Sequence, residues 1–363
     1  MATLKVDYSD GDILYAGSNL AANSGVNAIS TQINTNTAKI WTGLEHRAQG
    51  APSAGSKRGM VSCSSTTFIA TDGTNTQQGV LSSGILTWTA KDDKIASPLA
   101  LVTCDADPTK VLIFNTTNDI SWSDDSGATW TIAGTPPPNC TTIKDVHFFS
   151  ATLAVMVGNA ASGQEVWKST DGGDVWVQLT GSGLAGSTGL VSMFDATNGF
   201  IIKDDNAIFT YNGDNTYTDT GHTTNLATGA IYALSASTFL HVISARQAAQ
   251  KSVQMEYYDG TQNCYAICNP AQIDEQIATN IIQATNGYYY FIAIDSATSA
   301  DIKIVPILLF RSIDALAWEY RVVGATNTAN GKIGGYGMQL SEYDTNKLVY
   351  GSFNGGHLFI DES

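Results

Sequence analysis

Short runs of apolar and β-branched residues, separated by Gly, Asn, Asp and Ser, recur along most of the chain. In seven places such a run is followed by a small turn and a second run, a pattern that predicts two adjacent antiparallel strands. These paired runs begin at Val61, Val102, Val146, Val191, Ile231, Ile281 and Met338. The long repeat of apolar runs separated by Gly and Asn turns fits no helical repeat protein, so the sequence predicts an all-β protein.

Two nearly identical segments indicate a second turn in each repeat. Both contain Ser-x-Asp-x-Gly, with Trp at the eighth position. The Asp side chain accepts hydrogen bonds from backbone N–H groups nearby, Gly permits a positive φ, and Trp covers the turn as the next strand begins. The motif consists of Ser123, Asp125, Gly127, Thr129 and Trp130 in the first segment, and of Ser169, Asp171, Gly173 and Trp176 in the second.

Weaker copies of this turn extend the repeat over most of the chain. The aromatic residues that end the turns stand at positions 88, 130, 176, 217, 265 and 318, so they are separated by 42, 46, 41, 48 and 53 residues. This spacing is that of one four-stranded propeller blade. Together with the seven paired runs, it predicts a seven-bladed β-propeller.

The two ends of the sequence complement each other. After Trp318, 45 residues remain (363 minus 318), which is about one blade period. The segment Ala38 to Leu44 resembles the outer strand that the last blade lacks, and its Trp41 corresponds to the aromatic residue that ends the turn in each repeat. We therefore expect residues 38–363 to form the propeller, with a last blade that takes three strands from the C-terminus and one from the N-terminus. Such closure leaves no blade edge unpaired.

Residues 1–37 are left over as an N-terminal arm. Ala22, Val26, Ile29 and Ile33 are spaced 4, 3 and 4 residues apart, which predicts a short helix with an a/d seam. Two interpretations stay open: a helix packed on the flank of the propeller, or an oligomerisation or docking helix. β-Branched residues at both seam positions favour trimers or higher states.

Composition and charge exclude several classes of protein. Lys and Arg total 18 against 33 Asp and Glu, which gives a net charge of -15. Such an acidic chain repels phosphate, so we expect no nucleic-acid binding. The sequence has no apolar run long enough for membrane insertion and no secretory signal. Its five cysteines are too sparse for a disulfide framework, and we expect all five to be buried as small hydrophobes.

These residues carry two resemblances. The Ser-x-Asp-x-Gly turns resemble the Asp-box, or BNR, motif, and residues 38–363 resemble the Asp-box propellers that include sialidase-like folds and photosystem assembly factors. In such families the motif is a folding device on the outer side of the ring. The opening segment, Val6 to Thr37, resembles N-terminal segments of bacteriophage tail-fibre and other virion proteins.

An Asp-box enzyme of the sialidase type would need three Arg around a substrate carboxylate. Only five Arg are present, and the Arg-Ile-Pro signature of that family is absent from the first blade. Among the five Arg, Arg311 precedes a predicted turn and Arg321 lies within a predicted outer strand. The five His show no metal-binding spacing, and we interpret His147 as a hydrogen-bonded core residue. We therefore expect no catalytic residues, metal or cofactor.

The sequence favours a non-enzymatic virion structural protein of a bacteriophage, of the tail-fibre, spike or capsid-decoration type, assembled in the host cytoplasm. Its arm would bind other virion proteins and form a homo-oligomer such as a trimer, and its propeller would bind a host surface glycan or protein. The candidate binding loops are residues 46–59, 133–142 and 325–337. The alternatives are a cellular assembly-factor propeller and a glycoside hydrolase. Asp105, Asp195 and Glu342, which follow predicted inner strands, are the carboxylates available to the hydrolase.

Overall fold

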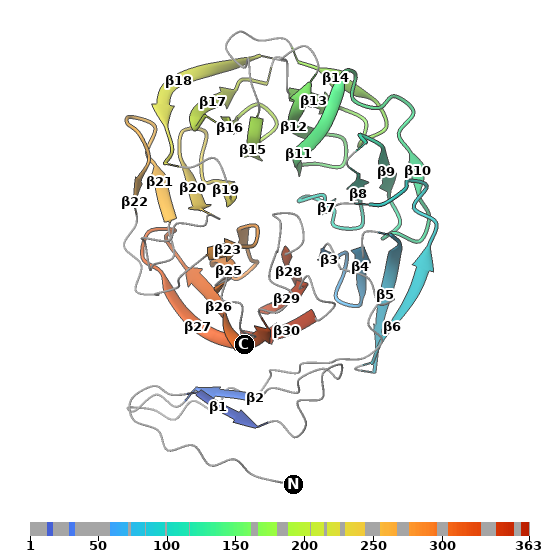
Figure 1. Ribbon diagram of the computed structural model, residues 1–363, viewed down its shortest axis with the longest axis vertical. Helices are drawn as coiled ribbons and strands as arrows, with labels where there is room; N and C mark the ends of the chain where they lie inside the picture. The colour runs from blue at the N-terminus through green and yellow to red at the C-terminus, as the bar shows by residue number, and fades with distance from the viewer. Residues whose placement is uncertain are drawn as a thin grey trace.

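The chain forms seven β-sheets arranged around a central axis (Figure 1). The computed structural model describes residues 13–16, 29–32, 59–71, 74–83, 85–98, 100–115, 117–160, 166–179, 188–203, 205–213, 216–225, 229–243, 255–266, 276–295, 304–327, 339–351 and 357–362. All sheets of the ring are antiparallel, and strand order within each follows the chain from the axis outwards. The fold is a seven-bladed β-propeller, as the repeat period predicts. We number its blades 1 to 7 in chain order.

The first four blades each contain four strands. Blade 1 comprises β3 (Met60–Ser62), β4 (Thr67–Thr71), β5 (Thr76–Ser82) and β6 (Ile85–Lys91). Blade 2 comprises β7 (Ala100–Thr103), β8 (Val111–Phe114), β9 (Ile120–Ser123) and β10 (Thr131–Ile132). Blade 3 comprises β11 (Cys140–Phe148), β12 (Ala154–Ala160), β13 (Val166–Ser169) and β14 (Trp176–Gln178). Blade 4 comprises β15 (Thr188–Met193), β16 (Gly199–Lys203), β17 (Ala207–Tyr211) and β18 (Tyr217–Thr223).

Blade 5 keeps this plan, and blades 6 and 7 vary it. Blade 5 comprises β19 (Gly229–Ala233), β20 (Phe239–Ile243), β21 (Met255–Tyr258) and β22 (Tyr265–Ala266). Blade 6 comprises β23 (Gln276–Ala278), β24 (Ile282–Gln283), β25 (Tyr289–Asp295), β26 (Ile304–Ser312) and β27 (Glu319–Asn327). Blade 7 comprises β28 (Gln339–Asp344), β29 (Lys347–Gly351) and β30 (His357–Asp361). In blade 6 the innermost strand is split, since β23 and β24 both pair with β25.

Buried apolar side chains hold neighbouring blades together. Seven clusters among the described residues each join two adjacent blades, so the core is a ring of interfaces between blades. One of them closes the ring: Phe68 of blade 1 packs edge-to-face against Phe359 of blade 7, with ring centroids 5.5 Å apart. Blades 1 and 7 therefore meet through side-chain packing. The fourth strand expected for blade 7, with Trp41, lies outside the described residues.

The N-terminal arm contains a hairpin where the sequence predicts part of a helix. Strand β1 (Ile13–Ala16) pairs antiparallel with β2 (Ile29–Gln32). The predicted helix is therefore wrong at Ile29, where a run of Ile, Ser and Thr favours strand over helix. The other seam residues, Ala22, Val26 and Ile33, lie outside the described residues.

Three of the five cysteines are buried, as the sequence predicts. Cys63, Cys104 and Cys140 are free and buried as expected, whereas Cys264 is only partly buried. Cys268 lies outside the described residues. In the part of the chain that the structure describes there is no α-helix, and hence none that could cross a membrane.

Candidate functional site

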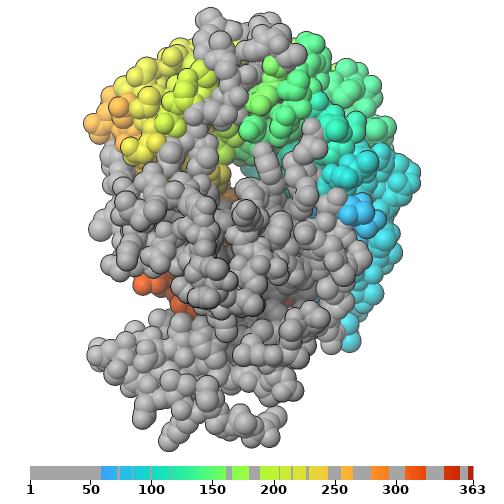
Figure 2. Space-filling view, viewed as in Figure 1, coloured from blue at the N-terminus to red at the C-terminus, as the bar shows by residue number. Residues whose placement is uncertain are grey.

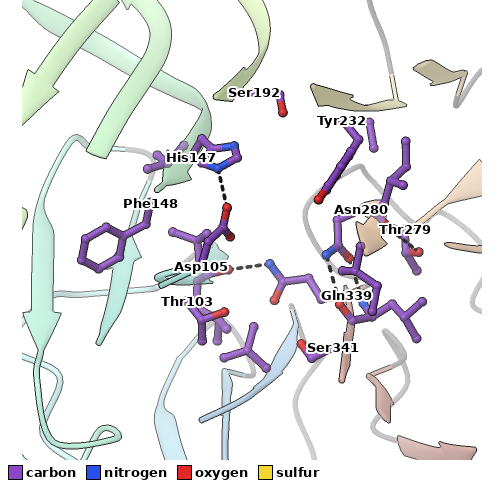
Figure 3. Close-up of a pocket in the computed structure, with 18 of the residues that line it drawn as sticks. Thr103, Asp105, His147, Phe148, Ser192, Tyr232, Thr279, Asn280, Gln339 and Ser341 are labelled. Carbon is purple, nitrogen blue, oxygen red and sulfur yellow. Dashed lines mark hydrogen bonds and ion pairs between the residues drawn. The ribbon is translucent and has the colours of Figure 1, made fainter. Parts of the chain in front are cut away.

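The innermost strands of the blades surround an axial cavity of about 590 Å³. Every blade contributes lining residues, from β3, β7, β11, β15, β19, β24 and β28 or the turns beside them. This volume lies within the usual range for small-molecule sites. Figure 3 shows polar side chains that converge on this space from several blades. The cavity is therefore the candidate functional site.

A histidine and an aspartate form one wall of the cavity. His147 Nε2 lies 2.8 Å from Asp105 Oδ2, although Asp105 follows β7 of blade 2 and His147 belongs to β11 of blade 3 (Figure 3). The other imidazole nitrogen of His147, Nδ1, accepts a hydrogen bond of 3.2 Å from the Met193 N–H of blade 4. Because Nδ1 accepts a hydrogen bond, neutral His147 carries its proton on Nε2, and this N–H donates a hydrogen bond to Asp105.

A second aspartate lies two residues before that histidine on the same strand. Asp145 accepts a hydrogen bond of 2.9 Å from its neighbour Val146 N–H and another of 2.9 Å from Val191 N–H of blade 4. Burial raises the pKa of Asp145 to about 6, against the effect of these hydrogen bonds. Asp145 and His147 thus both join blade 3 to the innermost strand of blade 4.

The opposite wall of the cavity carries a phenol and two amides. Figure 3 shows the side chain of Tyr232 pointing into the cavity from β19. Burial, together with the negative charge of Asp105, raises the pKa of Tyr232 to about 12, so its hydroxyl remains protonated. Asn280 donates to Leu340 O at 3.0 Å and accepts from Leu340 N–H at 2.8 Å, which joins blades 6 and 7. Gln339 Nε2 donates to the carbonyl of Leu101 in blade 2 at 2.5 Å.

Of the three carboxylates expected to follow inner strands, Asp105 and Asp195 do so, whereas Glu342 lies within β28, because that strand continues to Asp344. Asp105 and Glu342 line the cavity, whereas Asp195 is outside its lining and accepts hydrogen bonds from its own turn, at Thr197 and Asn198. Glu342 accepts bonds from the N–H and the hydroxyl of Thr285, at 2.7 and 2.8 Å. Each of these carboxylates therefore has hydrogen-bonding partners within the fold.

One Ser-x-Asp-x-Gly turn connects β9 to β10 in blade 2, and the other connects β13 to β14 in blade 3. Both turns therefore join outer strands, away from the cavity. In the first, Asp125 accepts from Thr129 N–H at 2.8 Å and from its hydroxyl at 2.6 Å. Ser123 Oγ accepts from the buried Gly127 N–H at 2.8 Å. Trp130 is buried beside the turn. These contacts give the residues a structural role.

The second turn repeats this arrangement. Asp171 Oδ1 accepts from Val175 N–H at 3.0 Å, and Ser169 Oγ accepts from Gly173 N–H at 2.8 Å. Trp176 is buried and donates from Nε1 to the carbonyl of Gly173. The two turns thus share a serine hydroxyl that accepts from the glycine N–H and an aspartate that accepts from N–H groups later in the turn.

Arg311 and Arg321 lie away from the cavity, as predicted. Arg311 and Arg321 are on β26 and β27, and both form ion pairs with Glu362 next to β30. The structure does not describe Arg47, Arg58 or Arg246. Among the described residues, no group of three His, Cys, Asp or Glu is placed to hold a metal ion.

Of the predicted candidate loops, only residues 133–142 are described in full. There Gly134 N–H donates to Asp174 Oδ1 at 2.9 Å, and Pro138 O accepts from Trp167 Nε1 at 2.9 Å. This segment therefore joins blade 2 firmly to blade 3. The cavity residues Asp145, Tyr232, Asn280 and Gln339 were not singled out by the sequence, because no local motif distinguishes them. The available signal is their position, within or next to the first strand of a predicted repeat.

Comparison with known proteins supports the fold. Neither models of protein families nor curated protein sequences match the chain. Solved structures do match. YCF48 bound to D1 peptide is 10% identical, with a TM-score of 0.57 over 89% of this chain and 96% of that one. The WD40 propeller of Doa1 is 11% identical, with a TM-score of 0.58 over 89% and 98%.

An enzyme is also among the similar structures. A catalytically inactive virginiamycin B lyase from Staphylococcus aureus, solved with quinupristin, is 9% identical, with a TM-score of 0.59 over 87% of this chain and 97% of that one. At such low identity these likenesses show the seven-bladed fold alone, since one propeller fold serves many functions.

Proposed function

We propose that this chain is a non-enzymatic binding propeller of a bacteriophage virion. One observation carries the binding role: the cavity carboxylates Asp105, Asp145 and Glu342 are each held by partners within the fold. A glycosidase needs one carboxyl group to donate a proton and a second to attack or to activate water. Carboxylates held in this way favour a binding surface over a hydrolytic pair.

The place in a virion rests on features of the sequence. The segment from Val6 to Thr37 resembles N-terminal segments of tail-fibre and other virion proteins. The chain is also poor in charged residues, at 14%, and rich in Gly and small polar residues. In this proposal residues 1–37 bind other virion proteins or further copies of the chain, and the propeller faces a host surface glycan or protein.

Purified particles provide the test. Mass spectrometry of particles should detect the intact chain at a constant ratio to the major capsid protein. A chain that lacks residues 1–36 should keep its thermal unfolding midpoint, because the ring closes through Phe68 and Phe359, and should be missing from particles. Absence of the intact chain from particles, or normal incorporation of the shortened chain, contradicts the proposal.

A cellular assembly factor is the second candidate, and the likeness to YCF48 favours it. The YCF48 structure contains a D1 peptide, so that propeller binds a peptide. An assembly factor of this kind would form a stable complex with a host protein precursor and would not be found in particles. The same mass spectrometry, applied to host complexes and to particles, separates the two candidates.

A further inference from the structure

The N-terminal hairpin lies beside blade 6 of the ring. Strand β2 is in contact with β27, the outermost strand of that blade. Figure 1 shows the β1–β2 hairpin outside the ring, on the side of blades 6 and 7. An isolated two-stranded hairpin is at best marginally stable in water, and β1 has the largely apolar sequence Ile-Leu-Tyr-Ala. The hairpin therefore depends on a surface that covers it.

The outer surface of blade 6 carries large apolar side chains that remain exposed in the single chain. Tyr320, on β27, is 40% exposed, and Ile313 and Leu316, in the turn before that strand, are 59% and 45% exposed. Exposed apolar side chains gathered on one turn and strand are typical of an interaction surface. The chain's own hairpin leaves this surface partly uncovered, so a hairpin from another copy has apolar area to bury there.

Contacts within the ring hold the outer surface of blade 6 in place. Arg311 on β26 and Arg321 on β27 both form ion pairs with Glu362, which follows β30 of blade 7 and has a side chain only 1% exposed. Tyr320 stacks on Phe310 of β26, with ring centroids 5.4 Å apart. Because the surface is already ordered, a hairpin that docks on it meets little cost of ordering it.

The connection between hairpin and ring is long enough to reach a second copy. Residues 33–58, which are 26 in number, join β2 to the start of the ring. A fully extended chain of this length spans about 90 Å, whereas a folded unit of about 300 residues is about 50 Å across. Exchange of an identical element between copies is a low-cost route to association, because the same contacts form within one chain and between two.

We propose that the outer surface of blade 6 is the docking site for the N-terminal hairpin of a second copy of this chain. In dilute solution the covalent connection supplies the hairpin to its own blade 6 at an effective concentration of about 1 mM, so the chain is a monomer. Where copies are held close together, the hairpin of one copy docks on blade 6 of the next and covers its exposed apolar side chains. This inference rests on the proposed role of residues 1–37 in binding further copies, and it names the surface that receives them.

Complementation between two full-length variants tests the site. The surface variant, Leu316→Ser with Tyr320→Ser, keeps the hairpin and loses apolar side chains of blade 6. The hairpin variant, Thr31→Pro, keeps that surface and loses a main-chain N–H of β2, where Thr31 pairs with Leu14. Sedimentation should show each variant alone as a monomer, and an equimolar mixture should contain a species with twice the mass of one chain.

A matched control separates this surface from exposed apolar side chains in general. Val175→Ser with Val177→Ser removes two side chains that are 38% and 56% exposed at the outer strand of blade 3. The hairpin of this control stays on its own blade 6, so its mixture with the hairpin variant should remain monomeric at the same concentration. Leu316→Ser alone keeps the stacking of Tyr320 on Phe310 and should still associate with the hairpin variant, which guards against a folding defect in the surface variant.

Hydrogen exchange of the main-chain amides in β1 and β2 reports directly on the hairpin. These amides should exchange slowly in the native chain and in the blade 3 control, because the hairpin is docked in both. They should exchange fast in the surface variant alone and become slow again when the hairpin variant is added, since that chain supplies a free blade 6.

The outcomes separate failure of this inference from failure of the virion role. The proposal is overturned if the surface and hairpin variants form no complex, if the blade 3 control forms as much complex, or if the hairpin amides exchange as fast in the native chain as in the surface variant. Incorporation into particles that depends on the arm, without such a complex, would leave the virion role standing and assign the arm to another virion protein. Absence of the chain from particles would contradict the virion role and leave the complex unaffected.

Discussion

His147 and Asp105 face each other across the boundary between blades 3 and 2, with Nε2 and Oδ2 2.8 Å apart. Because His147 Nδ1 also accepts from Met193 of blade 4, one imidazole joins three consecutive blades at the wall of the cavity. The Asp105 N–H adds a main-chain bond of 2.9 Å to Phe148 of blade 3. The polar groups of the site thus also hold the blades in place.

The serine of each Ser-x-Asp-x-Gly turn should matter at least as much as the aspartate. Ser123→Ala leaves the buried N–H of Gly127 without its acceptor and should cost about 1–3 kcal/mol of unfolding free energy. Asp125→Ala exposes its donors to water and should cost about 1 kcal/mol. Asp124→Ala, on the same turn, should stay within about 0.5 kcal/mol. Urea unfolding measures all three, and a larger loss for Asp124→Ala would refute this assignment.

The glycine of the second turn is required by both conformation and space. Gly173 has a φ of +105°, and an added Cβ would lie 2.3 Å from Leu112 Cδ2. Gly173→Ala should therefore destabilise the protein by about 2–4 kcal/mol. Gly221, with a φ of +73° and nothing within 4 Å of its Cβ position, is the matched control. Gly221→Ala should cost only about 1 kcal/mol, and equal thermal shifts for the two variants would refute the steric part.

Asp145 should make stability depend on pH. Since its pKa is raised to about 6 in the folded protein, the folded state binds the proton more tightly than the unfolded chain does. Its contribution is fully present below the unfolded pKa and is lost as pH rises through about 6. The unfolding free energy of the native chain, minus that of Asp145→Asn, should therefore fall by about 1–3 kcal/mol between about pH 4 and pH 7.

Asp195 provides a control of opposite sign. Hydrogen bonds from the Thr197 N–H and from Asn198 lower its pKa, so its contribution is present above its unfolded pKa and is lost in acid. The difference between the native chain and Asp195→Asn should rise with pH through the acidic range. If the free-energy differences for Asp145→Asn and Asp195→Asn change with pH in the same direction, the burial of Asp145 does not control its titration.

The blades could be predicted because their signals are local. The turn that starts at Ser123 and the strand that starts at Val146 are each defined within about ten residues by alternation and turn residues. A degenerate turn was also found: Asp314 accepts from Leu316 and Ala317 N–H groups before Trp318. Repetition of such local units was sufficient to predict the ring.

The site could not be predicted in the same way, because its contacts join different blades. Asp105 and His147 are separated by 42 residues, and Gln339 and Leu101 by 238. His147 is hydrogen-bonded as predicted, but it lies partly exposed at the cavity wall and not in the core, because its position depends on how the blades are rotated about the axis. In the arm, the spacing of Val26 and Ile29 suggested a helix, whereas the strand at Ile29 depends on pairing with distant residues near Ile13.

We propose that this propeller binds its target without cleaving it. The most direct measurement is the release of reducing ends when the purified protein is incubated with sialylated and capsular polysaccharides, with a known glycosidase as the positive control. We predict no release above the level without protein, even for a polysaccharide that the protein retains in a pull-down. Release that disappears in Asp105→Asn or Glu342→Gln would contradict it and would make the cavity an active site.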